Sequence, residues 1–194
     1  MSLKQYLTDD SFVRKLRPFS FGTYEHCEKL FREAFLLTDR TVNENDFEML
    51  PEYKEVIQWL SASQGKGILM TGANGRGKTA ILKGVIPLIF KSRGYNLRVL
   101  NSTEINPNDF HEYLRKKKFI AIDEVGKDSI IKDYGNVKDP VEAAIDHCED
   151  HIKLLLMTSN LTAEQIKSRY GNRTLDRIRR LCKIVVFKGE SFRK

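Results

Sequence analysis

The sequence predicts an α/β fold in which helices cover both faces of an open, doubly wound parallel sheet. Five short apolar runs lie between residues 68 and 187, and stretches with helical spacing separate them. The chain has 194 residues, enough for one compact domain. With 41% hydrophobic and 30% charged residues, the composition is that of a folded protein. We expect a short helical N-terminal extension over residues 1–48 and a core over 49–194.

The first fifty residues have a helical pattern. Apolar side chains recur three or four residues apart, so one face of this segment should pack on the core: Tyr24, Cys27, Leu30, Phe31, Ala34 and Phe35. Pro51 suits the first turn of the next helix. The apolar side of that helix is supplied by Val56, Ile57, Trp59 and Leu60.

The five apolar runs are mostly continuous rather than alternating. They cover residues 68–70, 97–100, 119–122, 154–157 and 184–187. Continuous apolar runs are typical of parallel strands that are buried on both faces. In such sheets the ligand site lies beyond the carboxyl ends of the strands, so polar residues there are the candidate site.

A phosphate-binding pattern follows the first run. Its residues match G-x-x-x-x-G-K-[ST] in full: Gly72, Ala73, Asn74, Gly75, Arg76, Gly77, Lys78 and Thr79. Glycines let the loop turn its backbone N–H groups toward phosphate oxygens. Lys78 is expected at the β- and γ-phosphates, and the Thr79 hydroxyl at Mg²⁺. The pattern therefore predicts binding of ATP with Mg²⁺.

Polar residues follow two later runs. Asp123 and Glu124 come directly after the third, where the first carboxylate can hold Mg²⁺ and the second can accept a proton from the attacking water. Asn160 follows the fourth run, where its amide could orient that water. We expect these side chains to converge on the phosphate loop and to hydrolyse ATP.

The chain resembles the DnaC/IstB group of AAA+ ATPases. The resemblance is carried by residues 72–79, 122–126, 158–160 and 188–193, and it covers roughly residues 50 to 194. It implies a P-loop fold with sheet order 5-1-4-3-2, Walker B residues Asp123 and Glu124, and a sensor 1 residue at Asn160. Members of the group load replicative helicases onto DNA or assist transposases. We expect a helicase loader that acts in DNA replication, and an IstB-like transposition helper is the alternative.

The same resemblance implies an arginine finger within residues 169–178. In this group an arginine of one subunit completes the site of the next, so self-association is expected. We assign the finger to Arg173 and keep Arg177 as the second choice.

The stretch after Asn160 is too short for a full helical lid domain, as in the helicase loaders. A small-molecule P-loop kinase is the alternative of another class.

The net charge of +7 favours an anionic partner. Two basic stretches, residues 115–118 and 167–183, could follow single-stranded DNA through its phosphates, or could be solvated charged faces. Three scattered cysteines fit a reducing compartment, and no apolar run is long enough to span a membrane. We expect a cytoplasmic protein.

Overall fold

The computed structural model describes residues 18–40, 42–127 and 139–189, and within them the strands form one parallel sheet of five. The strands are β1 (Gly67–Gly72), β2 (Val99–Asn101), β3 (Phe119–Val125), β4 (Leu154–Ser159) and β5 (Cys182–Phe187). Their order is β2-β3-β4-β1-β5, which confirms the predicted order 5-1-4-3-2 read from the other edge. The α/β P-loop architecture is thus confirmed.

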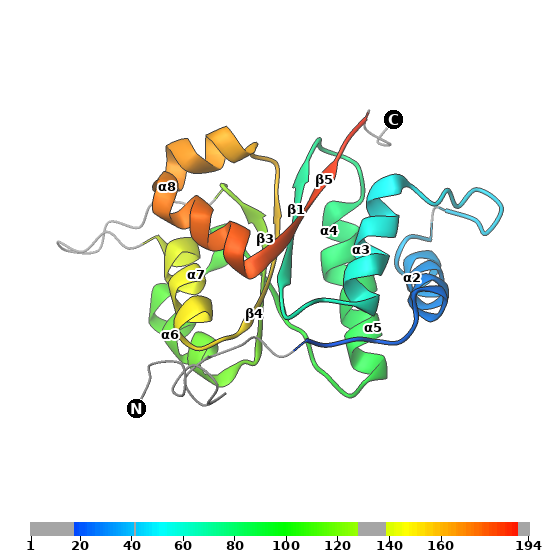
Figure 1. The fold of residues 1–194 in the computed structure, drawn as a ribbon, viewed down its shortest axis with the longest axis horizontal. Coiled ribbons are helices and arrows are strands. Elements are labelled where there is room, and N and C mark those ends of the chain that lie inside the picture. Colours follow the sequence, from blue (N-terminus) through cyan, green and yellow to red (C-terminus); the bar gives the residue numbers. More distant parts are fainter. Residues whose placement is uncertain (1–17, 41, 128–138, 190–194) are drawn as a thin grey trace, which may run out of the picture.

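Helices cover both faces of this sheet (Figure 1). One layer holds α2 (Tyr24–Thr38), α3 (Pro51–Ser61), α4 (Lys78–Ala80) and α5 (Ile86–Ser92), and the other holds α6 (Pro107–Lys116), α7 (Pro140–Asp150) and α8 (Ala163–Leu181). Strand residues alternate between two apolar clusters: Ile68 and Met70 of β1 pack on the first layer, whereas Leu69 packs on the second. Burial on both faces explains why the runs are continuously apolar.

The N-terminal helices form as predicted. The Thr23 side chain caps α2 by accepting from the His26 backbone N–H, and Pro51 lies in the first turn of α3. Phe31 of α2 and Trp59 of α3 belong to one apolar cluster, so α2 packs into the first layer of the core. The division at residue 48 stays a prediction.

A single helical segment follows the phosphate loop. It comprises α4, a wider π-helical turn over Ile81–Val85, and α5. A Cβ atom on Gly84 would lie 2.0 Å from Cγ2 of Thr38, the last residue of α2. Glycine at this position therefore allows α2 to pack against the wide turn.

Helix α8 begins with a capping box, in which Thr162 and Gln165 each bond the other's backbone N–H. The helix is kinked at Gly171, whose φ of 82° and ψ of 167° are not helical. Arg173 lies beyond this kink.

Residues 190–193 of the family-like C-terminal motif lie outside the described residues. Among the described helices, none is both long and apolar enough to cross a membrane.

Candidate functional site

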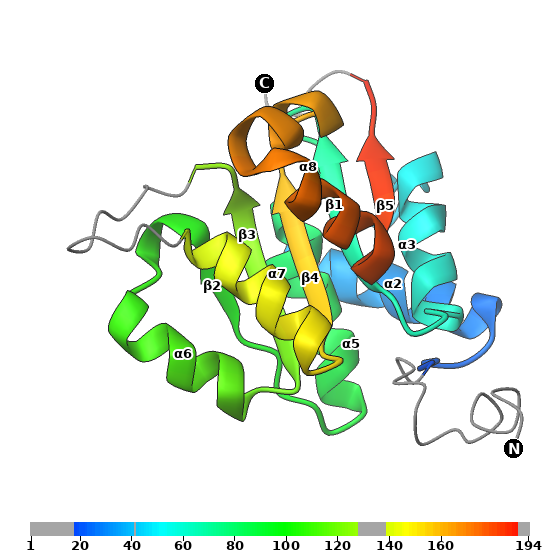
Figure 2. The same cartoon turned by 60° about the vertical axis from the view of Figure 1, so that its left-hand side comes forward.

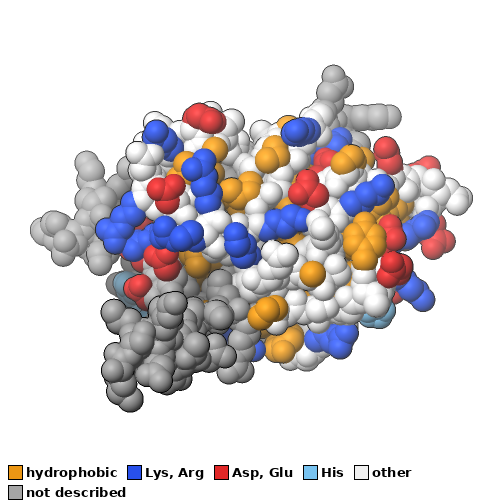
Figure 3. Space-filling model, in the orientation of Figure 1, with side chains coloured by type: hydrophobic (Ala, Val, Ile, Leu, Met, Phe, Trp, Pro, Cys, Tyr) orange, Lys and Arg blue, Asp and Glu red, His pale blue; other side chains and the backbone are white. Residues whose placement is uncertain are grey.

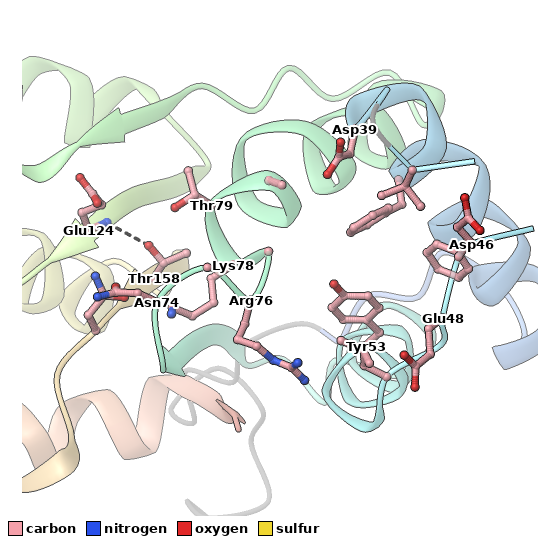
Figure 4. A pocket seen from close by; sticks show the side chains of 18 of the residues that line it. Asp39, Asp46, Glu48, Tyr53, Asn74, Arg76, Lys78, Thr79, Glu124 and Thr158 are labelled. Atoms are coloured by element: carbon pink, nitrogen blue, oxygen red, sulfur yellow. Dashed lines mark hydrogen bonds between the residues drawn. The ribbon is translucent and has the colours of Figure 1, made fainter. Parts of the chain in front are cut away.

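A pocket of about 720 Å³ opens at the carboxyl ends of the strands, which lie together at the top of Figure 2. Its two halves differ in origin (Figure 4). The loop half is lined by residues 74–80 with Glu124, Lys127, Thr158 and Asn160. The aromatic half comes from α2, α3 and the segment between them, and is lined by Phe35, Asp39, Val42, Asp46, Phe47, Glu48, Leu50 and Tyr53. The predicted location of the site, beyond the strand ends, agrees with this pocket.

The phosphate loop has the backbone that its glycines allow. Gly72 has a φ of +116°, and a Cβ atom there would lie 2.2 Å from the Phe187 carbonyl oxygen. The loop therefore leaves β1 tightly against β5, and the Ala73 N–H donates to that same carbonyl at 3.2 Å. Gly77, with a φ of +87°, precedes the first helical residue, Lys78. The helix thus begins at the pocket, with its positive end toward it.

Lys78 is the buried cation of the loop half. Its Nζ donates to the Gly72 and Ala73 carbonyls at 2.8 and 2.6 Å, and the residue is only 6% exposed. Burial lowers the pKa of this ammonium, and the nearby charge of Asp123 opposes that shift. The cation is thus held between loop and carboxylate, where an anion entering the loop would favour its charged form.

Arg76 turns its side chain away from the loop toward helix α3. Its Nη2 and Nε donate to Oε1 of Glu52 at 2.6 and 3.2 Å. Both residues are buried, at 9% and 5% exposure. The pair fastens the phosphate loop to α3, a contact that the sequence did not predict.

The tip of β3 contains a bulge that places both predicted carboxylates. Between the pairs Ile122–Met157 and Val125–Ser159 the register shifts, with one more residue on β3 than on β4. Glu124 adopts a φ of +61° there, which is unusual for a residue other than glycine. A bulge changes the direction of successive side chains, so Asp123 and Glu124 can both serve one site.

Thr158 of β4 joins these two residues. Its Oγ1 donates to Asp123 Oδ1 at 2.5 Å and accepts from the Glu124 backbone N–H at 2.9 Å. The Glu124 carbonyl in turn accepts from Ser102 Oγ at 2.7 Å. Sequence reasoning noted Thr158 within its strand tip but gave the role there to Asn160. Asn160 is exposed and lines the pocket.

Asp123 fits the role of a metal-supporting carboxylate. It is fully buried, and Thr79 Oγ1 donates to its Oδ1 at 3.2 Å. Its Oδ2 forms an ion pair with Lys83 Nζ at 2.9 Å and has no further hydrogen-bond partner among the described residues. A hydroxyl beside a buried carboxylate oxygen is a donor set that suits Mg²⁺. Thr79 and Asp123 are therefore the residues that would hold the metal.

The carboxylate of Glu124 forms an ion pair with Lys127. Its Oε1 lies 2.5 Å from Lys127 Nζ, with the two side chains 29% and 54% exposed. A carboxylate that is only partly buried, at the pocket wall, can accept a proton from a water molecule. The sequence analysis did not predict a role for Lys127. Opposite charges three residues apart are common on protein surfaces, so this spacing does not single out a functional residue.

The sequence analysis did not predict that the aromatic half would belong to the site. Tyr53 packs against Phe35 with ring centroids 5.4 Å apart, and Phe47 lies 5.3 Å from Phe35. Burial raises the pKa of Tyr53 to about 12. Three carboxylates, from Asp39, Asp46 and Glu48, lie around these rings (Figure 4). An aromatic wall beside a phosphate loop offers a flat ligand a stacking surface.

The two candidate fingers differ in their surroundings. Arg177 is 13% exposed and is paired with Asp146 and with Glu149, the latter at 2.7 Å. Arg173 is exposed, does not line the pocket, and forms no ion pair among the described residues. Arg173 is therefore the arginine with an accessible guanidinium, as a contact with another subunit requires.

The basic stretches are partly neutralised within the chain. Arg180 donates to Glu149 at 2.6 Å, and Lys116 lies 2.5 Å from Glu112. Figure 3 shows Lys and Arg side chains over the α8 side of the molecule with Asp and Glu between them. The surface is mixed rather than uniformly positive.

Comparison with solved structures identifies the fold. The DnaC helicase loader superposes with a TM-score of 0.58 at 14% identity, covering 75% of this chain and 95% of that one. A primosome component from Streptococcus pyogenes serotype M3, described as putative, gives 0.56 at 17% identity, covering 79% and 90%. DnaI gives 0.53 at 19% identity, covering 66% and 73%.

The chain has the fold of the DnaC helicase loader. AMPPCP-bound DnaA from Aquifex aeolicus shares it at a TM-score of 0.50 and 14% identity, over 78% of this chain and 51% of that one. No protein-family model and no curated sequence matches the chain. The expected resemblance to DnaC-type AAA+ proteins is confirmed at the level of the fold.

Proposed function

We propose that this protein is an AAA+ ATPase that binds ATP with Mg²⁺, hydrolyses it, and acts in DNA replication as a helicase loader. The observation that carries the proposal is that Lys78, Thr79 and Glu124 line one pocket, while buried Asp123 lies directly behind it, bonded to Thr79 and to Thr158. These groups come from three separate elements, and a packing role alone does not require them to converge.

Each residue has a distinct role in this proposal. The loop amides and Lys78 bind the phosphates and neutralise charge that develops on the transferred phosphoryl group. Thr79 and Asp123 hold Mg²⁺, which supplies further positive charge at the phosphates. Glu124 accepts the proton of the attacking water, and Asn160 orients that water. The aromatic half of the pocket stacks on the base.

Substitution of Glu124 by Gln tests the chemistry. The variant should bind ATP with unchanged affinity, because the carboxylate acts on water, while phosphate release falls by about 10² to 10⁴-fold. Calorimetry and a phosphate-release assay measure the two quantities. The wild-type protein could instead transfer phosphate to a small molecule and release no inorganic phosphate. That result would establish the alternative function, a small-molecule kinase.

The fold and the exposed position of Arg173 support the proposed partners. The protein would self-associate, with Arg173 of one subunit reaching the ATP of the next, and would engage single-stranded DNA in the cytoplasm. Arg173→Ala should keep ATP affinity but lose any ATPase activity that depends on protein concentration or DNA. Arg177→Ala is the matched comparison and should mainly lower stability, because Arg177 pairs with Asp146 and Glu149. If Arg177→Ala removed the concentration-dependent activity and Arg173→Ala did not, the finger would be Arg177.

Co-purification decides between the two possible partners. Capture of a hexameric replicative helicase supports the loader, and capture of a transposase supports an IstB-like helper instead. ATPase rates with single-stranded and with duplex DNA provide the second measurement. Stimulation by single strands alone is the result expected of a loader.

A further inference from the structure

The carboxylate of Asp123 is held on both oxygens by groups of this chain. Its Oδ1 accepts from the hydroxyls of Thr158 and Thr79, at 2.5 and 3.2 Å. Its Oδ2 faces the ammonium of Lys83 at 2.9 Å. The side chain of Asp123 is 1% exposed, and hydroxyl groups carry no net charge to balance it. Two ammonium groups balance this charge: buried Lys78 lies near Asp123, and Lys83 forms the direct ion pair with it.

Lys83 is placed by the same helix that carries Thr79. It lies four residues later, in the wide turn over Ile81–Val85, so both side chains reach the tip of β3. Wide turns of this kind are frequent at functional sites. The side chain of Lys83 is 41% exposed, which leaves its ammonium a path into solvent. The ion pair can thus open without unpacking the core.

We propose that Lys83 is a positioning residue that neutralises and orients Asp123 until a divalent cation binds between Thr79 and Asp123. This inference rests on the proposed function, in which Asp123 supports Mg²⁺. Ammonium and Mg²⁺ are both cations attracted to this one carboxylate and repelled by each other, so each would weaken the binding of the other. With Mg²⁺ and nucleotide bound, Lys83 would be free to turn toward solvent, to which its side chain is 41% exposed. The chain thereby avoids an unpaired buried charge in either state.

The first test measures how much Mg²⁺ is needed for ATP binding. Calorimetric titrations with ATP at increasing Mg²⁺ should show that Lys83→Met lowers the half-saturating Mg²⁺ concentration by about three- to tenfold, since a competing cation is removed. Lys83→Arg should retain the wild-type Mg²⁺ requirement. Lys91→Met, which removes an exposed lysine of α5, is the matched control and should change nothing. An unchanged or higher Mg²⁺ requirement in Lys83→Met would overturn the competition.

The second test examines the ion pair without nucleotide. In EDTA, Lys83→Met should lower the unfolding temperature in the wild-type background but not in Asp123→Asn, where no buried charge needs a partner. An equal loss in both backgrounds would refute the pairing. A wild-type chain that bound no ATP at any Mg²⁺ concentration would refute the proposed function and the competition, whereas this cycle would still decide whether Lys83 and Asp123 are paired.

Discussion

The loop half of the pocket consists mainly of backbone amides and strand tips, whereas the aromatic half consists of side chains from α2, α3 and the segment between them. In the loop half, Lys78 and Thr79 follow glycines at fixed spacing, and Asp123 and Glu124 lie at the carboxyl end of an apolar run, within β3. In the aromatic half, Phe35 and Tyr53 meet across two helices with no fixed spacing. The difference teaches that side chains suited to a charged ligand are placed by a short local motif, whereas side chains suited to stacking are placed by the packing of helices.

The largest effect is expected from Lys78→Ala. This change removes the buried cation of the loop half, so affinity for both ATP and tripolyphosphate should fall by at least about a hundredfold. Calorimetry with the two ligands measures it. Retention of tripolyphosphate binding would show that the loop half does not bind phosphates through Lys78.

This contrast also explains what could be predicted from sequence. The strands and the phosphate loop were predictable, because burial on both faces and a glycine-rich turn each leave a local pattern. Glu52 and Arg76 were not, since their contact joins residues 24 positions apart. The bulge that turns Asp123 and Glu124 toward one site, and Thr158 that links them, arise only when β3 and β4 pair.

The contact between the two halves gives the next largest effect. Glu52→Ala leaves the buried guanidinium of Arg76 without this carboxylate, which should lower the free energy of unfolding by about 3 kcal/mol. Glu55→Ala on the same helix removes only a partly exposed partner of Lys183 and should cost less than about 1 kcal/mol. Urea denaturation of both variants measures the difference. Equal losses would mean that the buried pair does not stabilise the joint between loop and α3.

A medium effect is expected from Phe47→Ala. Loss of this ring from the aromatic half should weaken ATP binding by about tenfold, because stacking on a base contributes roughly 1–3 kcal/mol. Tripolyphosphate has no base, so its affinity should stay at the wild-type value. The two affinities, measured by calorimetry on one preparation, separate stacking from unfolding of the site. A parallel loss for both ligands would contradict the assignment of this half to the base.

The smallest effect is expected from Glu48→Gln. The carboxylate of Glu48 lines the aromatic half with Asp39 and Asp46, and together their negative charges disfavour phosphates there. In the proposed ATP complex, this repulsion would favour the triphosphate in the loop half and leave the aromatic half to the uncharged base. Because the groups are partly solvated, neutralising one should raise tripolyphosphate affinity by only about twofold. The gain should shrink as salt is raised, since screening weakens the repulsion. A gain that persists at high salt would indicate a new contact and not the removal of a charge.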